Sequence, residues 1–206
     1  MSLYLDRYAF PSLGIKEEPP PNTGLTVVIP VFNEPDVLPS LKSLHTSDLP
    51  DAHTEVIIVI NEPEPCNPAI ANHNENTFQI VSNWIQENAL NDVSFYVTRI
   101  RLPKKHAGVG LARKAGMDEA IRRFERIGND KGIIVCYDAD STCSSSYLKS
   151  IYNAFQDQNL FGASIHYEHL TDGLTETEKE GILQYELHLR YYVNALRKAG
   201  YPYSFH

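Results

Sequence analysis

The sequence predicts an α/β fold in which helices cover both faces of a mostly parallel central sheet. The chain has 206 residues, of which 42% are hydrophobic and 21% are charged, so it can bury a sizeable core as one globular domain. Short apolar runs rich in Val and Ile recur along it, and segments with helical spacing of apolar residues separate them. Strands that alternate with helices in this way are joined by crossovers, which make the strands parallel.

The first two predicted strands are the most apolar runs of the chain. Residues 25–31 (LTVVIPV) and 55–60 (EVIIVI) have the length and the β-branched composition of buried strands. Between them, Asn33 is predicted to cap a helix that has Pro35 in its first turn and extends to about Leu44. These segments form the first strand–helix–strand unit.

The remaining elements continue the alternation. Residues 61–76, rich in Pro and Asn, are predicted to form a long loop. The predicted helices share apolar residues spaced three or four apart and comprise residues 77–88, 109–127, 146–156 and 175–199. The further predicted strands are apolar runs at residues 93–102, 132–137 and 160–166.

The chain is expected to consist of a peripheral N-terminal segment, residues 1–24, and a single domain, residues 25–206. Residues 17–22 (EEPPPN) support this boundary because consecutive prolines favour an extended, non-helical backbone. A single domain is also the number that the chain length favours.

Charge and cysteine content exclude several classes of protein. The formal net charge is −8, whereas proteins that bind nucleic acid or anionic membranes nonspecifically are basic, so we expect no nucleic-acid partner. No apolar stretch reaches the roughly 18 residues of a membrane-spanning helix, so we expect no transmembrane segment. The three cysteines form no Cys-x-x-Cys pair, which indicates a reducing, cytoplasmic location.

Ligands of parallel α/β sheets bind at the carboxyl ends of the strands. This rule selects residues 30–34, 61–64, 103–110 and 138–140 as candidate binding segments. In the first segment, Phe32 offers a ring to a nucleobase and Glu34 offers an acceptor to a ribose hydroxyl; the alternative is a plain strand-to-helix turn. In the second, Asn61 either reads a base edge or belongs to an ordinary loop.

Two carboxylates, Asp138 and Asp140, directly follow the apolar run at residues 132–137. Carboxylates so close together repel each other unless a cation lies between them, and Mg²⁺ or Mn²⁺ binds carboxylate and phosphate oxygens together. The alternative is that both residues only cap the turn with Ser141 and Thr142. The sequence leaves both interpretations open.

A basic block without Asp or Glu lies between Arg99 and Met117. Its basic members are Arg99, Arg101, Lys104, Lys105, Arg113 and Lys114. The block includes a glycine-bearing loop before a predicted helix, where main-chain amides and cations favour a bound phosphate; the alternative is a solvated basic surface. Gly108-x-Gly110 is not a dinucleotide fingerprint, because it follows the third strand and lacks a third glycine at the required spacing.

The order of three segments resembles the family 2 glycosyltransferases, which have the GT-A fold. The segments are VVIPVFNEPDVLPSLKSL, KKHAGVGLARKAGMDEAI and IIVCYDADS, and the resemblance covers about residues 24–170. Gly108 to Gly116 is similar to the family's Gly-x-x-x-Ala-Arg-Asn-x-Gly block, with Lys114 in the Asn position. Asp138-Ala139-Asp140 resembles the family's metal-binding Asp-x-Asp motif.

The resemblance implies an inverting, metal-dependent transfer of a sugar from a nucleotide-diphospho-sugar to a hydroxyl of a carbohydrate or lipid-linked acceptor. It implies that Asp138 and Asp140 hold Mn²⁺ or Mg²⁺. The residues that it places at the donor are Pro30, Phe32, Glu34, Asn61, Lys105, Gly108, Arg113 and Asp138. Because family members often work at the cytoplasmic face of a membrane, it also implies a peripheral position there.

Two departures from the family pattern matter. The usual Asp-Asp-Gly-Ser after the second strand is replaced by Asn61-Glu62-Pro63-Glu64, which leaves the base preference open. The family's acceptor half, with an Asp or Glu general base, normally follows the donor half, and no carboxylate after Asp140 lies in a motif of that kind. We therefore expect a donor-binding half that is truncated at its C-terminus, and we name no catalytic base.

Two other functions stay open on the sequence. A sugar-phosphate nucleotidyltransferase would share the α/β layers and the metal carboxylates, but its Gly-rich basic loop after the first strand is absent from PVFNEPDV. A noncatalytic nucleotide-binding fragment would need no general base.

Overall fold

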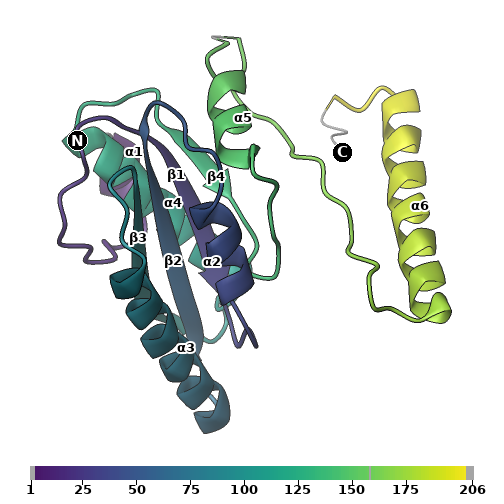
Figure 1. The fold of residues 1–206 in the computed structure, drawn as a ribbon, viewed down its shortest axis with the longest axis horizontal. Coiled ribbons are helices and arrows are strands. Elements are labelled where there is room, and N and C mark those ends of the chain that lie inside the picture. The colour runs from purple at the N-terminus through teal and green to yellow at the C-terminus, as the bar shows by residue number, and fades with distance from the viewer. Residues whose placement is uncertain (1–2, 158, 203–206) are drawn as a thin grey trace. The chain divides into compact units, whose positions relative to one another are not determined.

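The computed structural model describes residues 3–157 and 159–202. The chain divides into two compact units, Met1–Asp157 and Gln158–His206, and each is described by itself (Figure 1). Within the described ranges, every helix is too short or too polar to serve as a membrane span. The domain limits that the sequence suggests, 1–24 and 25–206, stay predictions.

The first unit is built on a four-stranded sheet with the strand order β3-β2-β1-β4. Each neighbouring pair of strands is parallel. The strands are β1 (Thr23–Val31), β2 (His53–Glu64), β3 (Val93–Pro103) and β4 (Ile133–Cys136). The predicted α/β fold with a parallel central sheet is therefore confirmed.

The pairing register brings the carboxyl ends of the central strands to one edge of the sheet. Val31, the last residue of β1, pairs with Ile60 near the end of β2. Val28, also in β1, pairs with Cys136, the last residue of β4. The segments that follow β1, β2 and β4 thus leave the sheet at the edge where ligands of parallel sheets bind.

Helices cover both faces of this sheet, as predicted. The helices on the first face are α2 (Leu38–His45), α3 (Pro68–Glu87) and α5 (Tyr147–Ala154), which pack on apolar residues of β1, β2 and β4. On the opposite face, α4 (Val109–Arg126) packs against Ile57 and Val59 of β2. In Figure 1, α2 lies in front of the sheet and α4 lies behind it.

The N-terminal segment, defined here as residues 3–18, shares the second face with α4. It begins with the short helix α1 (Leu3–Arg7). Further along, Leu13 and Ile15 pack on the same apolar cluster as α4. This face is therefore closed by one long helix and one extended segment.

Helix α4 approaches β1 closely at Gly116. A Cβ atom at this position would lie 2.3 Å from Cγ1 of Val28, far inside ordinary van der Waals contact. Glycine inside a helix costs about 0.5–1 kcal/mol relative to alanine, and here the close helix–strand packing requires it.

The helix after β1 begins later than the sequence predicts. Asn33 does not cap it: its φ is +50°, and α2 begins at Leu38 with Val37 at the N-cap. Pro35 precedes the helix instead of lying in its first turn. A short polar stretch with Asn and Pro suits a turn as well as a helix start. Here the turn occupies the residues between β1 and Leu38, and the helix begins after it.

The prediction of a long loop at residues 61–76 is wrong. Strand β2 continues to Glu64, and α3 begins at Pro68. Asn67 is the N-cap, and its side chain accepts a hydrogen bond from the Ala69 amide at 2.9 Å. Asn followed by Pro is also typical of a helix start. The same residue types therefore predict a loop or a helix N-terminus, and the sequence alone did not distinguish the two.

The second unit contains the helix α6 (Glu176–Lys198). Thr175 caps it and forms a capping box with Glu178, in agreement with a predicted helix over residues 175–199. The predicted strand at residues 160–166 is wrong, because these residues form no strand. A strand needs a neighbour with which to exchange main-chain hydrogen bonds, and residues 159–202 include none.

Candidate functional site

Arg113 and Asp138 meet at the carboxyl edge of the sheet. Arg113, in the second turn of α4, donates a hydrogen bond from its guanidinium to Oδ1 of Asp138, just after β4, at 2.6 Å. Both side chains are solvent-accessible, Arg113 at 31% and Asp138 at 62%. The structure thus brings together a cation and a carboxylate that the family resemblance places at the donor.

The start of α4 offers main-chain amides to an anion. Its N-cap is Gly108, which supplies no side-chain acceptor. The first amides of the helix therefore lack the partner that Ser, Thr, Asp or Asn would provide, and together with the helix dipole they favour a bound phosphate. Gly108 and Lys105 are both exposed, so a ligand can reach them.

The segment after β1 converges with the segment after β4. Burial raises the pKa of the Glu34 carboxyl above its ordinary value, and the negative charges of Asp140 and Asp36 raise it further. Glu34 follows β1 and Asp140 follows β4, so the two carboxylates lie near enough for their charges to repel each other. A cation bound at Asp140 would relieve this repulsion.

Ser40 of α2 holds the loop that carries the two carboxylates. Its hydroxyl lies 2.5 Å from the carbonyl oxygen of Ala139 and 2.6 Å from that of Ser141. The main-chain carbonyls of the loop are therefore held to α2 by the Ser40 hydroxyl. Asp138 and Asp140 are exposed, which leaves their carboxylates accessible to a ligand.

Asp138 and Asp140 have the chemistry that a hard divalent cation prefers. Mg²⁺ takes one or two protein carboxylates and completes its shell with phosphate oxygens and water. Within the described ranges, no group of three or more His, Cys, Asp and Glu residues could hold a metal by itself. The two carboxylates thus fit a metal that a diphosphate would hold jointly with the protein.

Phe32 and Pro30 differ in their access to a ligand. Phe32 is 47% exposed, so its ring can be reached from solvent. Pro30 is buried inside β1, in register with Val59 of β2. Of these two candidate nucleoside contacts, Phe32 is therefore the one that the fold presents at the surface.

Three asparagines link the ends of β1 and β2. Asn74 of α3 accepts a hydrogen bond from the Asn33 amide at 3.0 Å and donates one to the Asn61 carbonyl at 3.2 Å. Asn61 donates from Nδ2 to the Val31 carbonyl at 2.8 Å and is 1% exposed. The structure thus uses Asn61 to join two strands. Asn74 was not identified from the sequence, because residues 61–76 were assigned to a loop. Recognition of Asn67 as a helix N-cap would have placed Asn74 in a helix next to these strands.

Half of the predicted basic block is paired with buried carboxylates. Glu62, 1% exposed, accepts hydrogen bonds from Arg99 at 2.8 Å and from Arg101 at 3.1 Å. Burial acts to raise the pKa of Glu62, but the hydrogen bonds from the two arginines outweigh burial and lower it. Lys114 is paired with Asp118. The other members of the block are Lys104, Lys105 and Arg113, and the carboxylate paired with Arg113, that of Asp138, is exposed rather than buried.

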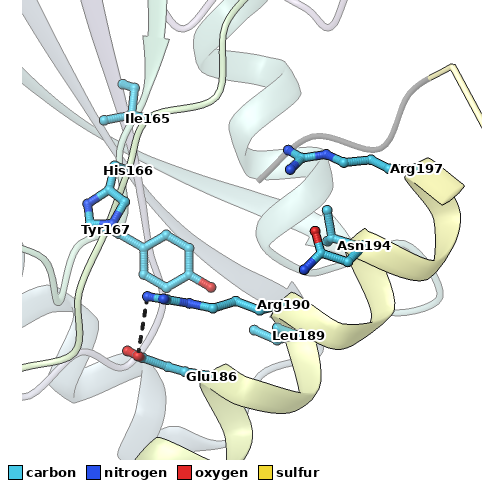
Figure 2. Close-up of a pocket in the computed structure, with 9 residues that line it drawn as sticks. Ile165, His166, Tyr167, Glu186, Leu189, Arg190, Asn194 and Arg197 are labelled. Atoms are coloured by element: carbon cyan, nitrogen blue, oxygen red, sulfur yellow. Dashed lines mark ion pairs between the residues drawn. The ribbon is translucent and has the colours of Figure 1, made fainter.

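The second unit has a hollow of its own, which Figure 2 shows. It has a volume of about 330 Å³ and lies between α6 and residues 165–167. Arg190 and Glu186 form an ion pair at 4.0 Å in its wall, and Nδ1 of His169 lies 2.9 Å from Oε1 of Glu186. The residues predicted to bind the donor do not line this hollow.

Solved structures that resemble the chain include three of TarS from S. aureus. TarS 1-349 matches at 16% identity and a TM-score of 0.45, its complex with UDP at 15% and 0.45, and its complex with UDP-GlcNAc at 17% and 0.45. Each match covers 73% of this chain, which spans about 40% of the length of the TarS chains. A comparison with curated proteins finds no match.

The family model described as glycosyl transferase family 2 matches residues 26–199. This range extends from β1 to the C-terminal end of α6 and includes every residue that the sequence places at the donor. Most of the sequence is therefore accounted for by one family. The chain belongs to glycosyl transferase family 2.

Proposed function

We propose that this chain binds the donor of a glycosyl transfer, a nucleotide-diphospho-sugar, whose sugar passes with inversion to a hydroxyl of a carbohydrate or lipid-linked acceptor. The observation that carries the proposal is the Arg113–Asp138 pair beside Asp140 at the carboxyl edge of the sheet. Membership of a glycosyl transferase family supports the class of reaction. A dependence on Mg²⁺ or Mn²⁺ is part of the proposal.

The diphosphate is bound by Arg113, Lys105 and the first amides of α4. These groups stabilise the negative charge that develops as the bond between the anomeric carbon and the diphosphate oxygen breaks. Asp138 and Asp140 would hold the divalent ion, which when bound neutralises further charge on the leaving diphosphate. Asp138 would then interact with both Arg113 and the metal.

The nucleoside is held at the end of β1. Phe32 stacks on the base, because its ring is exposed and every base has a π-face. Glu34 accepts a hydrogen bond from a ribose hydroxyl. The base itself is not selected by these contacts, since neither reads a base edge.

The acceptor hydroxyl attacks the anomeric carbon while a carboxylate takes up its proton. Carboxylates later in the chain include Glu168, Asp172 and Glu176, which are all exposed. Glu176 is paired with Lys179 at 2.9 Å. We assign no general base among them, and this favours a second candidate function, a nucleotide-binding unit that does not catalyse transfer by itself.

Thermal unfolding in the presence of UDP, GDP, CDP and dTDP, each with and without Mn²⁺, tests the proposal. A ligand at 100 times its dissociation constant adds about 2.7 kcal/mol to stability, so binding gives a clear shift. A shift that one nucleoside diphosphate produces only with Mn²⁺ is the expected result. No shift with any of them would contradict the donor site.

Product analysis separates the candidate functions. Release of a nucleoside diphosphate from a nucleotide-sugar supports the transferase, whereas release of pyrophosphate from a sugar phosphate and an NTP would show a nucleotidyltransferase. Metal-dependent binding without consumption of any donor would favour the noncatalytic unit.

A further inference from the structure

The N-terminal segment is fastened to α4 by a row of hydrogen bonds. Tyr4 donates from its hydroxyl to Oδ1 of Asp118 at 2.8 Å, and the Phe10 amide donates to Oδ2 of the same carboxylate at 2.6 Å. One residue further along α4, Oε2 of Glu119 accepts from the Ser12 hydroxyl at 3.1 Å and from the Leu13 amide at 2.9 Å. The two carboxylates thus take most of their partners from the N-terminal segment.

These carboxylates are buried, so loss of their hydrogen bonds would be energetically costly. Asp118 is 1% exposed and Glu119 is 0% exposed. A buried carboxylate without hydrogen-bond partners is costly, and the main-chain amides of the N-terminal segment supply those partners. The N-terminal segment therefore stabilises the buried carboxylates of α4.

Lys114 connects this arrangement to the donor site. It follows Arg113 directly, yet its ammonium faces the N-terminal segment: it donates to Asp118, to the Tyr4 hydroxyl at 3.1 Å and to the Tyr8 carbonyl at 2.9 Å. Burial acts to lower the pKa of Lys114, but the hydrogen bonds to Asp118 and Tyr4 outweigh it and raise the pKa. Lys114 is thus a structural cation in the middle of the basic block.

We propose that Tyr4, Lys114 and Asp118 form a positioning cluster, through which the N-terminal segment fixes the start of α4 and keeps Arg113 in reach of Asp138 and the donor diphosphate. Arg113 and Lys114 are neighbours in one helical turn, so fixing the main chain at Lys114 also fixes it at Arg113. A helix start that is already ordered binds a ligand without a further loss of conformational entropy. This inference rests on the proposed donor site.

The test compares Tyr4→Phe with Tyr8→Phe. Tyr4→Phe removes one hydroxyl that bonds both Asp118 and Lys114. The Tyr8 hydroxyl makes no hydrogen bond with the described residues, and the residue is 64% exposed, so Tyr8→Phe is a matched control. In the absence of ligand, we expect Tyr4→Phe to accelerate amide hydrogen exchange at residues 112–116 about fivefold, because the first turns of α4 open more often.

The second readout is the ratio of affinities for a nucleoside diphosphate and for its nucleoside, measured by calorimetry with Mn²⁺. We expect Tyr4→Phe and Lys114→Met each to weaken the diphosphate about three- to tenfold and to leave the nucleoside unchanged. The double variant should lose about as much as the worse single variant, because both act through one cluster. Lys114→Arg, which keeps the cation, should restore most of the loss.

The outcomes separate the two proposals. Unchanged exchange at the start of α4 in Tyr4→Phe would overturn the positioning cluster, and so would equal weakening of nucleoside and diphosphate. If the wild-type protein binds no nucleoside diphosphate while Tyr4→Phe still accelerates exchange, the proposed function fails and the control of α4 by the N-terminal segment stands.

Discussion

The two faces of the sheet are closed in different ways. On the face of α2, α3 and α5, a large apolar cluster fills the interior, with side chains such as Leu41 fully buried. On the α4 face, three ionisable residues of one helix are buried, namely Asp118, Glu119 and Arg123. An apolar side chain stabilises by leaving water, whereas a buried charge stabilises only while its partners are in place. The second face is therefore the one that single substitutions should damage most.

Arg123→Met should have the largest effect. The Arg123 guanidinium donates to both oxygens of Glu55, at 2.6 and 2.8 Å, and both side chains are fully buried. Removal of one partner leaves an uncompensated charge, so the free energy of unfolding in urea should fall by about 3–5 kcal/mol. Arg123→Met combined with Glu55→Leu should recover much of the loss; a single variant as stable as the wild type would remove the distinction between the faces.

Leu41→Ala tests the apolar face. Leu41 is 0% exposed, and its truncation leaves a cavity that should lower the free energy of unfolding by about 2–4 kcal/mol. Leu90, 45% exposed in the same unit, is the matched control, and Leu90→Ala should change stability by less than about 0.5 kcal/mol. Equal losses in the two variants would mean that burial does not govern this face.

Glu62→Gln should lower the free energy of unfolding by less than the two preceding variants, and the size of its effect should depend on pH. Because the pKa of Glu62 is lowered in the folded state, its contribution is present above the pKa of the unfolded chain and is lost as the pH falls through the folded value. At neutral pH, Glu62→Gln should cost about 1–3 kcal/mol, and this difference should shrink in acid. Glu64→Gln, at an exposed position, is the control. A loss of unfolding free energy in Glu62→Gln that does not vary with pH would contradict the ion pairing of Glu62 with the two arginines.

Asp140→Ala should affect stability least and ligand binding most. Asp140 is exposed at a loop end, so the free energy of unfolding should change by less than about 0.5 kcal/mol. The thermal shift that a nucleoside diphosphate produces with Mn²⁺ should disappear. Asp130→Ala, at another exposed carboxylate, should keep that shift, and an unchanged shift in Asp140→Ala would refute the metal assignment.

The sequence predicts the apolar face better than the charged face. Buried strands are recognisable because a run such as residues 56–60 is apolar throughout. In helix α4 the apolar Met117 and Ile121 are only partly buried, whereas the charged Asp118 and Arg123 are fully buried. A hydrophobic pattern cannot indicate that a charged residue is buried, because its partner lies far away in the sequence.

The candidate site shows the same limit. The sequence selects Asp138 from its position after a strand and Arg113 as a member of the basic block, and the structure joins them in an ion pair. The sequence does not reveal that Lys114, which follows Arg113, faces the N-terminal segment. Besides Asp118 in the same helix, the partners of Lys114 are a hydroxyl and a main-chain carbonyl more than a hundred residues away, and neither of these two leaves a signal in composition or spacing.

The strand order leaves β3 and β4 at the two edges of the sheet, and β3, with 11 residues, is the longer of them. An unpaired edge strand is a template onto which the same strand of another molecule can add. Near its carboxyl end β3 carries Arg99 and Arg101, and the side chain of Arg101 is 65% exposed. Parallel, in-register addition of a second copy would place like charges opposite each other, which should disfavour this mode of self-association.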